Sequence, residues 1–176
     1  MRRTSRRAVL AVAVVLGLGT LGTAGVSAAG ATTAATAQCS TADLSGQLKP
    51  GSPGAGQRYA TVVLTNRSGH TCTVGGYGGL GLLGSPRQGV PTDLRRVASP
   101  APTTVSLAPG GSVRSLLHWT VIQAGDEPAV CEPTAATVAL TPPNQTSALL
   151  LPWTFGPVCQ HGLIRQNAYV AGSAAF

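Results

Sequence analysis

The chain has 176 residues, which is enough for one domain and short for two. Twelve Lys and Arg residues stand against five Asp and Glu, which gives a formal charge of +7. Four of these charges, Arg2, Arg3, Arg6 and Arg7, lie at the N-terminus, so the rest of the chain is too weakly basic to indicate a nucleic-acid-binding protein. Lysine and glutamate are scarce, which argues against a helical bundle.

Residues 1–28 have the pattern of a secretory signal peptide. The arginines precede an unbroken apolar run at residues 8–16, and the small residues Val26-Ser27-Ala28 follow. We expect cleavage after Ala28, although the small residues ending at Ala37 offer a second site. Residues 29–38, rich in Ala and Thr, are predicted to be a flexible leader, and residues 39–176 one domain.

The signal segment leaves two alternatives open. Residues 8–26 are long enough to span a bilayer, so the segment could remain as an uncleaved anchor instead of being removed. Residues 5–10, Ser-Arg-Arg-Ala-Val-Leu, look like a twin-arginine signal core, so export by that route or by the general secretory route stays open.

Beyond the leader, short stretches with strand periodicity alternate with turn clusters. Alternation is clear at residues 58–65 and clearest at residues 112–121, where Trp119 falls on the apolar face and is expected in the core. Pro109 and Gly110 predict a type II turn before the second of these stretches. The predicted strands, in chain order, are residues 58–65, 103–107, 112–121, 137–141, 147–153 and 163–170, with the Gly-rich residues 75–84 as a bulged or sharply bent strand.

Four cysteines follow the signal, Cys39, Cys72, Cys131 and Cys159, and an even number in an exported chain predicts two disulfides. A strand that begins at Cys39 and pairs antiparallel with residues 59–65 would place Cys39 beside Cys72. We therefore favour Cys39–Cys72 and, by elimination, Cys131–Cys159. Closing loops of this length stabilises a fold by about 3.5 kcal/mol each in the chain-entropy model.

These elements predict an all-β fold. Turn signals recur at short intervals and no segment after the signal shows helical periodicity. We expect an immunoglobulin-like antiparallel β-sandwich of about seven or eight strands, held by the two disulfides.

Motifs for cofactor or metal binding are interpreted as structural. Residues 79–84 match G-x-G-x-x-G, but Ser85-Pro86 follow instead of a helix, so no dinucleotide cofactor is predicted. His70 and His161 each stand two residues from a cysteine, a spacing that zinc sites seldom use, so no metal site is predicted either.

No residue is predicted to be catalytic. The chain has no G-x-S-x-G nucleophile motif, and His118 falls on the polar face of its strand. Asp126 and Glu127 precede a proline and are interpreted as a solvated loop, not as a pair of glycosidase carboxylates. Trp153 is left undecided between the core and a sugar-binding face.

Two groups of motifs are similar to a known family. The first is residues 58–66, RYATVVLTN, with Thr71-Cys72-Thr73; the second is residues 107–112, LAPGGS, with residues 117–119, LHW. From Cys39 onward the chain resembles the actinobacterial secreted domain-of-unknown-function 4232 family. The resemblance implies a bacterial exported protein of the cell envelope with a β-sandwich fold, and it transfers no catalytic residue.

We therefore expect a secreted, extracellular or cell-envelope protein that acts as a non-enzymatic binding module for an unknown protein or envelope partner. Nucleic acid is not expected as a partner, and membrane contact is expected only through the N-terminal signal. The alternative is a secreted hydrolase (protease) inhibitor that uses a rigid loop near Cys131 or Cys159. Neither the ligand nor the oligomeric state can be inferred from these residues.

Overall fold

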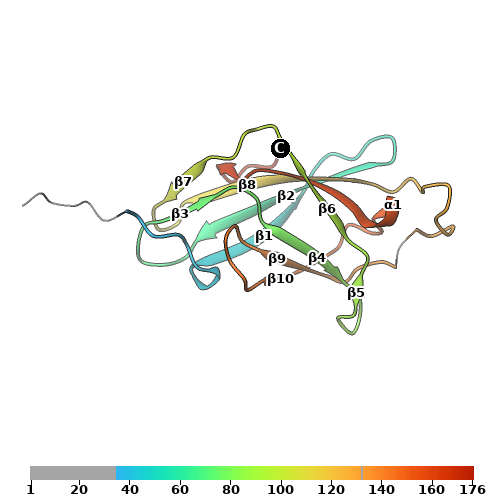
Figure 1. Cartoon of the computed structure of the whole chain (residues 1–176), viewed down its shortest axis with the longest axis horizontal. Coiled ribbons are helices and arrows are strands. Elements are labelled where there is room, and N and C mark those ends of the chain that lie inside the picture. Colours follow the sequence, from blue (N-terminus) through green and yellow to red (C-terminus); the bar gives the residue numbers. More distant parts are fainter. Residues whose placement is uncertain (1–34, 132) are drawn as a thin grey trace, which may run out of the picture. The chain divides into compact units, whose positions relative to one another are not determined.

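The computed structural model describes residues 35–131 and 133–176, so the predicted signal peptide and the leader up to residue 34 lie outside the described residues. The described chain is built almost entirely of strands (Figure 1). In chain order the elements are η1 (Thr41–Asp43), β1 (Leu44–Pro50), β2 (Gln57–Asn66), β3 (Cys72–Gly75), β4 (Gly79–Leu83), β5 (Gly89–Val90), β6 (Asp93–Val97), β7 (Thr104–Leu107), β8 (Ser112–Thr120), β9 (Thr137–Thr141), β10 (Leu149–Pro152), α1 (Cys159–Gly162), β11 (Leu163–Asn167) and β12 (Val170–Ala171).

The strands of this part of the chain form three sheets. The largest has the order β1-β2-β8-β11-β6, and β12 also pairs with β8. The second has the order β10-β9-β4-β5, and β3 and β7 form a separate two-stranded sheet. Every strand pair is antiparallel except β6 with β11. Among the described residues no helix has the length and apolar character needed to cross a membrane.

The two larger sheets share one apolar core, because β2 and β8 each turn alternate side chains inward. The pair runs antiparallel over nine residue positions, from Gln57 opposite Thr120 to Thr65 opposite Ser112. Leucine and valine side chains of β4 and β9 in the second sheet belong to the same buried cluster. The buried side chains that make up its centre are Ala60, Val62, Leu64, Leu82, Val113, Leu117, Trp119, Val138 and Leu140.

Several expectations from the sequence are met at residue level. Gly110 has φ +80° and the Gly111 amide donates to the Ala108 carbonyl, as the predicted type II turn requires. Trp119 is buried, and its indole packs 5.1 Å from the ring of Trp153, measured between centroids. Trp153 is therefore a core residue, and its Nε1 donates to the Gly156 carbonyl.

The sheet inventory differs from the prediction of seven or eight antiparallel strands. The described chain has twelve strands, of which β5 and β12 contain two residues each, and β6 pairs in parallel with β11. A strand of two residues is too short to be recognised from alternation of apolar and polar residues in the sequence. Strand β6 contains the adjacent Arg95 and Arg96, whose side chains are both exposed, so it lacks the apolar alternation that marks a strand.

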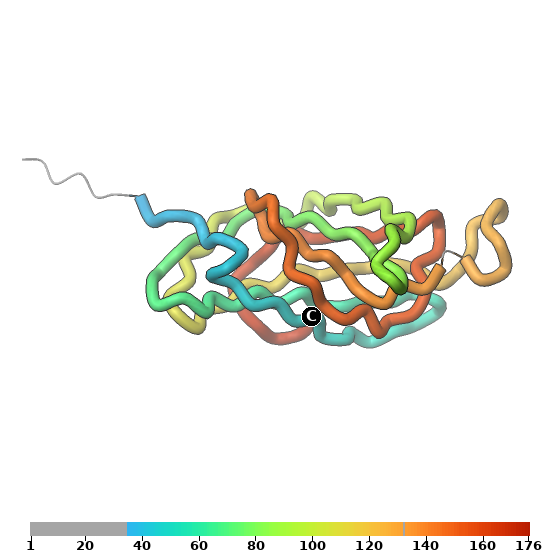
Figure 2. The backbone as a smooth tube through the Cα atoms, turned by 90° about the horizontal axis from the view of Figure 1, so that it is seen from below, coloured from blue at the N-terminus to red at the C-terminus, as the bar shows by residue number. Residues whose placement is uncertain are grey.

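The C-terminal segment, residues 172–176, covers the outer face of the largest sheet (Figure 2). Lys49 Nζ donates to the Ser173 carbonyl, and the Phe176 amide donates to Thr61 Oγ1. The Arg114 guanidinium lies 4.1 Å from the centroid of the Phe176 ring. The side chain of Thr61 lies on the face of β2 opposite the apolar core. It is nevertheless 0% exposed, because the C-terminal segment covers it.

The segment assigned as α1 is a left-handed turn and not an ordinary helix. Gln160, His161 and Gly162 have φ values of 57°, 58° and 78°. A side chain at Gly162 would collide with the Pro91 carbonyl oxygen, so this position requires glycine for space as well as for conformation. The absence of helical periodicity noted in the sequence is consistent with this turn.

Replacing Gly162 by alanine is expected to destabilise the fold through both effects. Gly156 is a matched control, because it has a similar φ of 77° but open space where a Cβ would lie. We expect Gly156→Ala to cost about 1–2 kcal/mol for the left-handed conformation and Gly162→Ala to cost clearly more. Urea unfolding of both variants measures the difference; equal losses would show that the Pro91 contact does not constrain the turn.

Candidate functional site

Strands β1 and β10 are the free edges of their two sheets and lie next to each other. Among the described residues, β1 pairs only with β2, and β10 pairs only with β9. Side chains of β10 reach β1 at Gly46, where a Cβ atom would lie 3.2 Å from Leu149 Cδ1 and 3.1 Å from Leu151 Cδ1. Glycine at this position therefore lets the two leucine side chains reach the backbone of β1.

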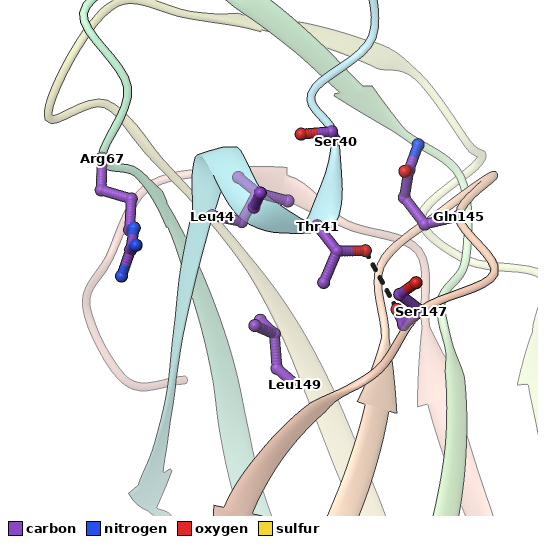
Figure 3. Close-up of a pocket in the computed structure, with 8 residues that line it drawn as sticks. Ser40, Thr41, Leu44, Arg67, Gln145, Ser147 and Leu149 are labelled. Atoms are coloured by element: carbon purple, nitrogen blue, oxygen red, sulfur yellow. Dashed lines mark hydrogen bonds between the residues drawn. The ribbon is translucent and has the colours of Figure 1, made fainter.

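A hollow of about 480 Å³ lies at the beginning of both strands (Figure 3). Its apolar surface comes from Leu44 and Leu149, and polar side chains of the 40–41 and 145–147 segments surround it. Of the described residues that line it, Arg67 alone is charged. Thr41 Oγ1 donates to the Ser147 carbonyl at 3.0 Å, which ties the two walls together.

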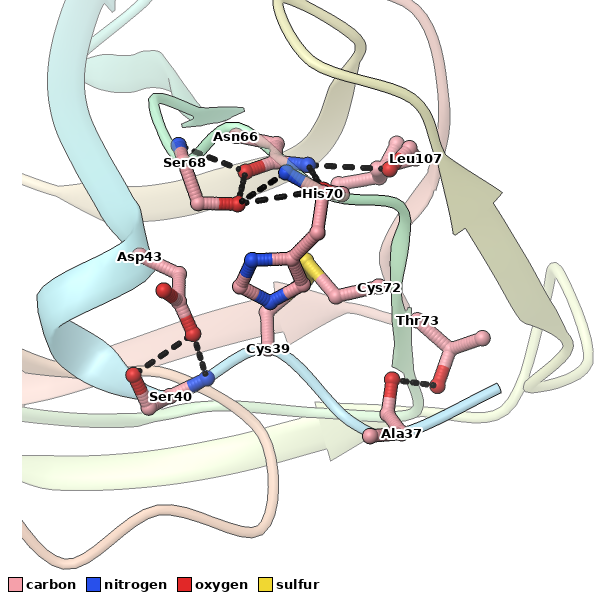
Figure 4. The surroundings of a disulfide bond; sticks show 10 residues. All are labelled: Ala37, Cys39, Ser40, Asp43, Asn66, Ser68, His70, Cys72, Thr73 and Leu107. Carbon is pink, nitrogen blue, oxygen red and sulfur yellow. Dashed lines mark hydrogen bonds between the residues drawn. A yellow bond between two sulfur atoms is a disulfide. The ribbon is translucent and has the colours of Figure 1, made fainter. Parts of the chain in front are cut away.

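The short helix η1 forms one wall and is fixed by its own N-terminal cap. The Asp43 carboxylate accepts hydrogen bonds from the Ser40 hydroxyl and the Ser40 amide, at 2.6 and 2.8 Å (Figure 4). The hydroxyl bond and then the amide bond lower the pKa of Asp43. Ser40 thus stabilises the charged form of the Asp43 carboxylate. The Asp43 backbone carbonyl accepts a hydrogen bond from the Arg67 amide at 2.7 Å.

Asn66 and the disulfide Cys39–Cys72 hold the turn that carries Arg67. Asn66 Nδ2 donates to the carbonyls of His70 and Leu107, and Asn66 Oδ1 accepts from the Ser68 amide (Figure 4). The Cys39 amide also donates to the Thr73 carbonyl, which brings the chain before η1 alongside β3. Both sides of the hollow are therefore built from restrained backbone.

A second hollow, of about 250 Å³, lies farther along the same two strands. Leu48 of β1, Leu151 and Pro152 of β10, and Phe155 line it. We call the two hollows, with Leu44, Gly46 and Leu48 of β1, Leu149 and Leu151 of β10 and Arg67 at one end, the β1–β10 groove; Leu150 lines neither hollow. Its surface is mostly apolar, with a single charge at one end, which is the usual character of a binding site.

The family model for a domain of unknown function, DUF4232, matches residues 39–169. The chain belongs to this family. The match covers both disulfides and every residue that lines the β1–β10 groove in this DUF4232 domain. No curated protein and no solved structure matches the chain.

The four cysteines of the DUF4232 domain form the two disulfides that the sequence analysis favours. Cys39–Cys72 and Cys131–Cys159 have Cα separations of 4.9 and 5.1 Å. Two disulfides indicate an oxidising environment. Ala37 and Gln38, which the sequence places in the leader, pair with Thr73 beside the first disulfide.

A carboxylate stands beside the second disulfide, but this cluster is no metal centre. One oxygen of Glu127 and the sulfurs of Cys131 and Cys159 lie within 4.8 Å of one another. Both sulfurs are covalently bonded to each other and so cannot act as thiolate ligands. Glu127 instead accepts hydrogen bonds from the backbone amides of Ala124 and His161.

The three histidines lie in different places. His70 is exposed in the turn after β2, and His118 Nε2 lies 2.7 Å from Gln57 Oε1. The His118 ring stacks on Tyr59, and burial, followed by the charge of Arg165, lowers its pKa. His161 Nε2 lies 3.2 Å from Asp126 Oδ1, and both of these side chains are largely exposed.

The Gly-rich motif at residues 79–84 forms β4 and the start of a hairpin to β5. A strand–hairpin arrangement does not present the helix N-terminus that a dinucleotide phosphate needs. The sequence analysis did not single out Leu44, Gly46, Arg67, Leu149 or Leu151. Their common feature is the adjacency of two sheet edges, which no local pattern in the sequence records.

The Glu127 carboxylate is expected to make the free energy of unfolding depend on pH in the acidic range. Burial alone would raise its pKa, but the amides of His161, Ala124 and Gln160 outweigh burial and lower it. A lowered native pKa contributes stability above the unfolded value of about 4.3, and this contribution is lost as the pH falls through the native pKa. Urea unfolding between pH 6 and 3 should therefore show a smaller acid-induced loss in Glu127→Gln than in the wild type; identical pH profiles would contradict this role.

Proposed function

We propose that this DUF4232 protein is exported to the cell envelope or extracellular space and acts there as a non-enzymatic binding module. Residues 1–28 have the composition of a secretory signal, and the resemblance of the sequence implies an actinobacterial source. The two disulfides support an oxidising destination. The binding surface in this proposal is the β1–β10 groove.

One observation carries the proposal: two hollows, lined by leucines and ending at Arg67, lie along two free strand edges. Apolar surface that is left concave and uncovered marks interaction sites in proteins of this size. Edge strands that are neither covered nor charged along their length invite pairing with another chain. Between Leu44 and Leu48, β1 carries no charged side chain.

Structural contacts of the acidic side chains favour a role without catalysis. Asp43 accepts from Ser40, Glu127 accepts from backbone amides, and Asp93 pairs with Arg95 at 2.8 Å. The apolar core that the two larger sheets share supports the interpretation of the fold as an immunoglobulin-like sandwich. Such a scaffold would present the groove as a rigid surface.

Export and groove-dependent binding can be tested on the same preparation. The full-length chain expressed in an actinobacterium should appear in the medium or envelope without residues 1–28. On reduction, its mass should rise by two hydrogen atoms for each of the two disulfides. Intact mass spectrometry measures both. Retention in the cytosol with reduced cysteines would contradict the export part of the proposal.

The exported protein, immobilised, should capture a partner from envelope extract through the groove. Leu149→Glu places a charge in the first hollow, whereas Leu150→Glu is a matched control on the neighbouring residue, which is 46% exposed. We expect capture to fall at least about tenfold in Leu149→Glu and to persist in Leu150→Glu, provided both variants retain a cooperative unfolding transition. Equal capture by the two variants would exclude the groove as the binding surface.

A second function, inhibition of a secreted protease, is favoured by a different surface. Val130 is 77% exposed and directly precedes Cys131, whose disulfide to Cys159 anchors its loop. Gln123 Nε2 donates to the Pro128 carbonyl across this loop, and the Ala124 amide donates to Glu127. A restrained loop with an exposed apolar side chain loses little entropy on entering a protease cleft. Figure 1 shows the loop at the opposite end of the unit from β3 and β7.

Titration of an elastase-type protease, which accepts small aliphatic side chains, tests this second function. Stoichiometric inhibition by the wild type, lost in Val130→Asp and retained in Leu150→Asp, would establish it. Full residual protease activity at an equimolar ratio, with the exported protein intact, would remove it.

A further inference from the structure

We propose that the ligand of the β1–β10 groove is an extended peptide that adds to the free edge of β1 and carries two apolar side chains four residues apart, followed by a carboxylate. This inference rests on the binding function proposed above and specifies the class of partner. It is drawn from the spacing of the hollows, from the unpaired edge and from the charge at one end.

The unpaired edge of β1 provides the backbone contacts. Its seven residues, Leu44–Pro50, pair with Asn66–Ala60 of β2 on one side. On the other side, the Leu44 amide donates to the Thr41 carbonyl, whereas the outward backbone groups of Gly46 and Leu48 have no hydrogen-bond partner among the described residues. An added strand would satisfy the outward amides and carbonyls, as in β-strand addition. Leu149 and Leu151 of β10 would then pack against the side chains of the added strand.

The spacing of the two hollows determines the pattern of apolar residues. Leu44 lines the first hollow and Leu48 lines the second, and both have the same parity as Gly46 on β1. A strand advances about 3.3 Å per residue, so these positions lie roughly 13 Å apart. Side chains four residues apart on an added strand would enter the two hollows.

Gly46 imposes a further requirement on the residue between the two apolar side chains. Leu149 Cδ1 and Leu151 Cδ1 already come within 3.2 and 3.1 Å of a Cβ position there. The ligand residue opposite Gly46 therefore has to be small, because the space above the glycine is filled by leucine methyl groups. Glycine, alanine or serine meets this condition.

Arg67 defines the charge of the ligand and the end at which it lies. Its guanidinium is exposed, and Arg67 is the one charged residue that lines the first hollow. The neighbouring Asp43 carboxylate is engaged by Ser40. Antiparallel pairs are the more frequent and slightly more stable arrangement, so the C-terminal side of the peptide would lie at Leu44 and Arg67. An Asp, a Glu or a terminal carboxylate would then follow the second apolar residue.

The inference can be tested by selection from a displayed library of random 12-residue peptides against the exported, disulfide-bonded protein. We expect enrichment of sequences with an apolar residue, a small residue two positions later, a second apolar residue two positions after that, and then an acid. Enrichment of unrelated sequences, or none, would overturn the inference. If envelope capture nevertheless depended on Leu149, the binding function would stand and only the peptide class would be wrong.

A synthetic consensus peptide from the selection then tests each contact by fluorescence anisotropy. Leu149→Glu and Arg67→Glu should each raise Kd at least about tenfold, whereas Leu150→Glu and Arg165→Glu, both exposed and outside the groove, should leave Kd within about twofold. Arg67→Glu should recover affinity for a peptide in which the acid is replaced by lysine.

Affinity unchanged in Arg67→Glu would overturn the assigned orientation and charge. A stable dimer formed by the free protein, dissociated by Leu149→Glu but not by the peptide, would show that a second copy occupies the groove and would overturn the inference as a whole. Arg67 is exposed, so its variant remains informative if Leu149→Glu fails to fold.

Discussion

The long antiparallel pairing of β2 with β8 organises the rest of this molecule. Nine residue positions are paired, and each strand turns an apolar face toward the second sheet. β1 extends the ladder on one side, and β11 and β12 pair with β8 on the other. Because side chains alternate along a strand, a slip of one position would turn every buried residue of these strands outward. The register of this one pair therefore determines where Leu44, Gly46 and Leu48 lie on β1.

Local patterns in the sequence were sufficient for this central pair. Alternation located β2 and β8 to within about a residue at each end, and Pro109-Gly110 located the turn before β8. The cysteine pairing was predicted correctly, but the strand expected to begin at Cys39 begins at Leu44, and Cys39 lies beside Cys72 because its amide donates to the Thr73 carbonyl. These features depend on neighbours in sequence or on one antiparallel pair, which periodicity can detect.

Features that depend on the order of strands in space could not be predicted in this way. The parallel pairing of β6 with β11 joins segments about seventy residues apart, and β6 has no apolar alternation. The groove depends on which strands are left at the sheet edges and on which edge faces which. The leucines of β1 and β10 have the local sequence context of any half-buried strand, so no local pattern distinguishes a groove leucine from a core leucine.

The groove and the loop at Cys131 differ in how their backbone is held. At the groove, the walls are regular strands and a capped turn, and the open surface is apolar. At Cys131, a disulfide and the Glu127 carboxylate hold irregular backbone whose exposed side chain is Val130. The first arrangement favours a partner that continues the sheet, and the second favours a partner with a cleft.

The C-terminal segment has a consequence for the mechanics of the largest sheet. It covers Thr61, and both Thr61 and Val63 are buried, so the middle of β2 is shielded from water on both faces. Thermal breathing of this sheet should consequently begin at its outer strands and reach the β2 centre last. A strand added to the free edge of β1 would therefore leave the pairing of β2 with β8 intact.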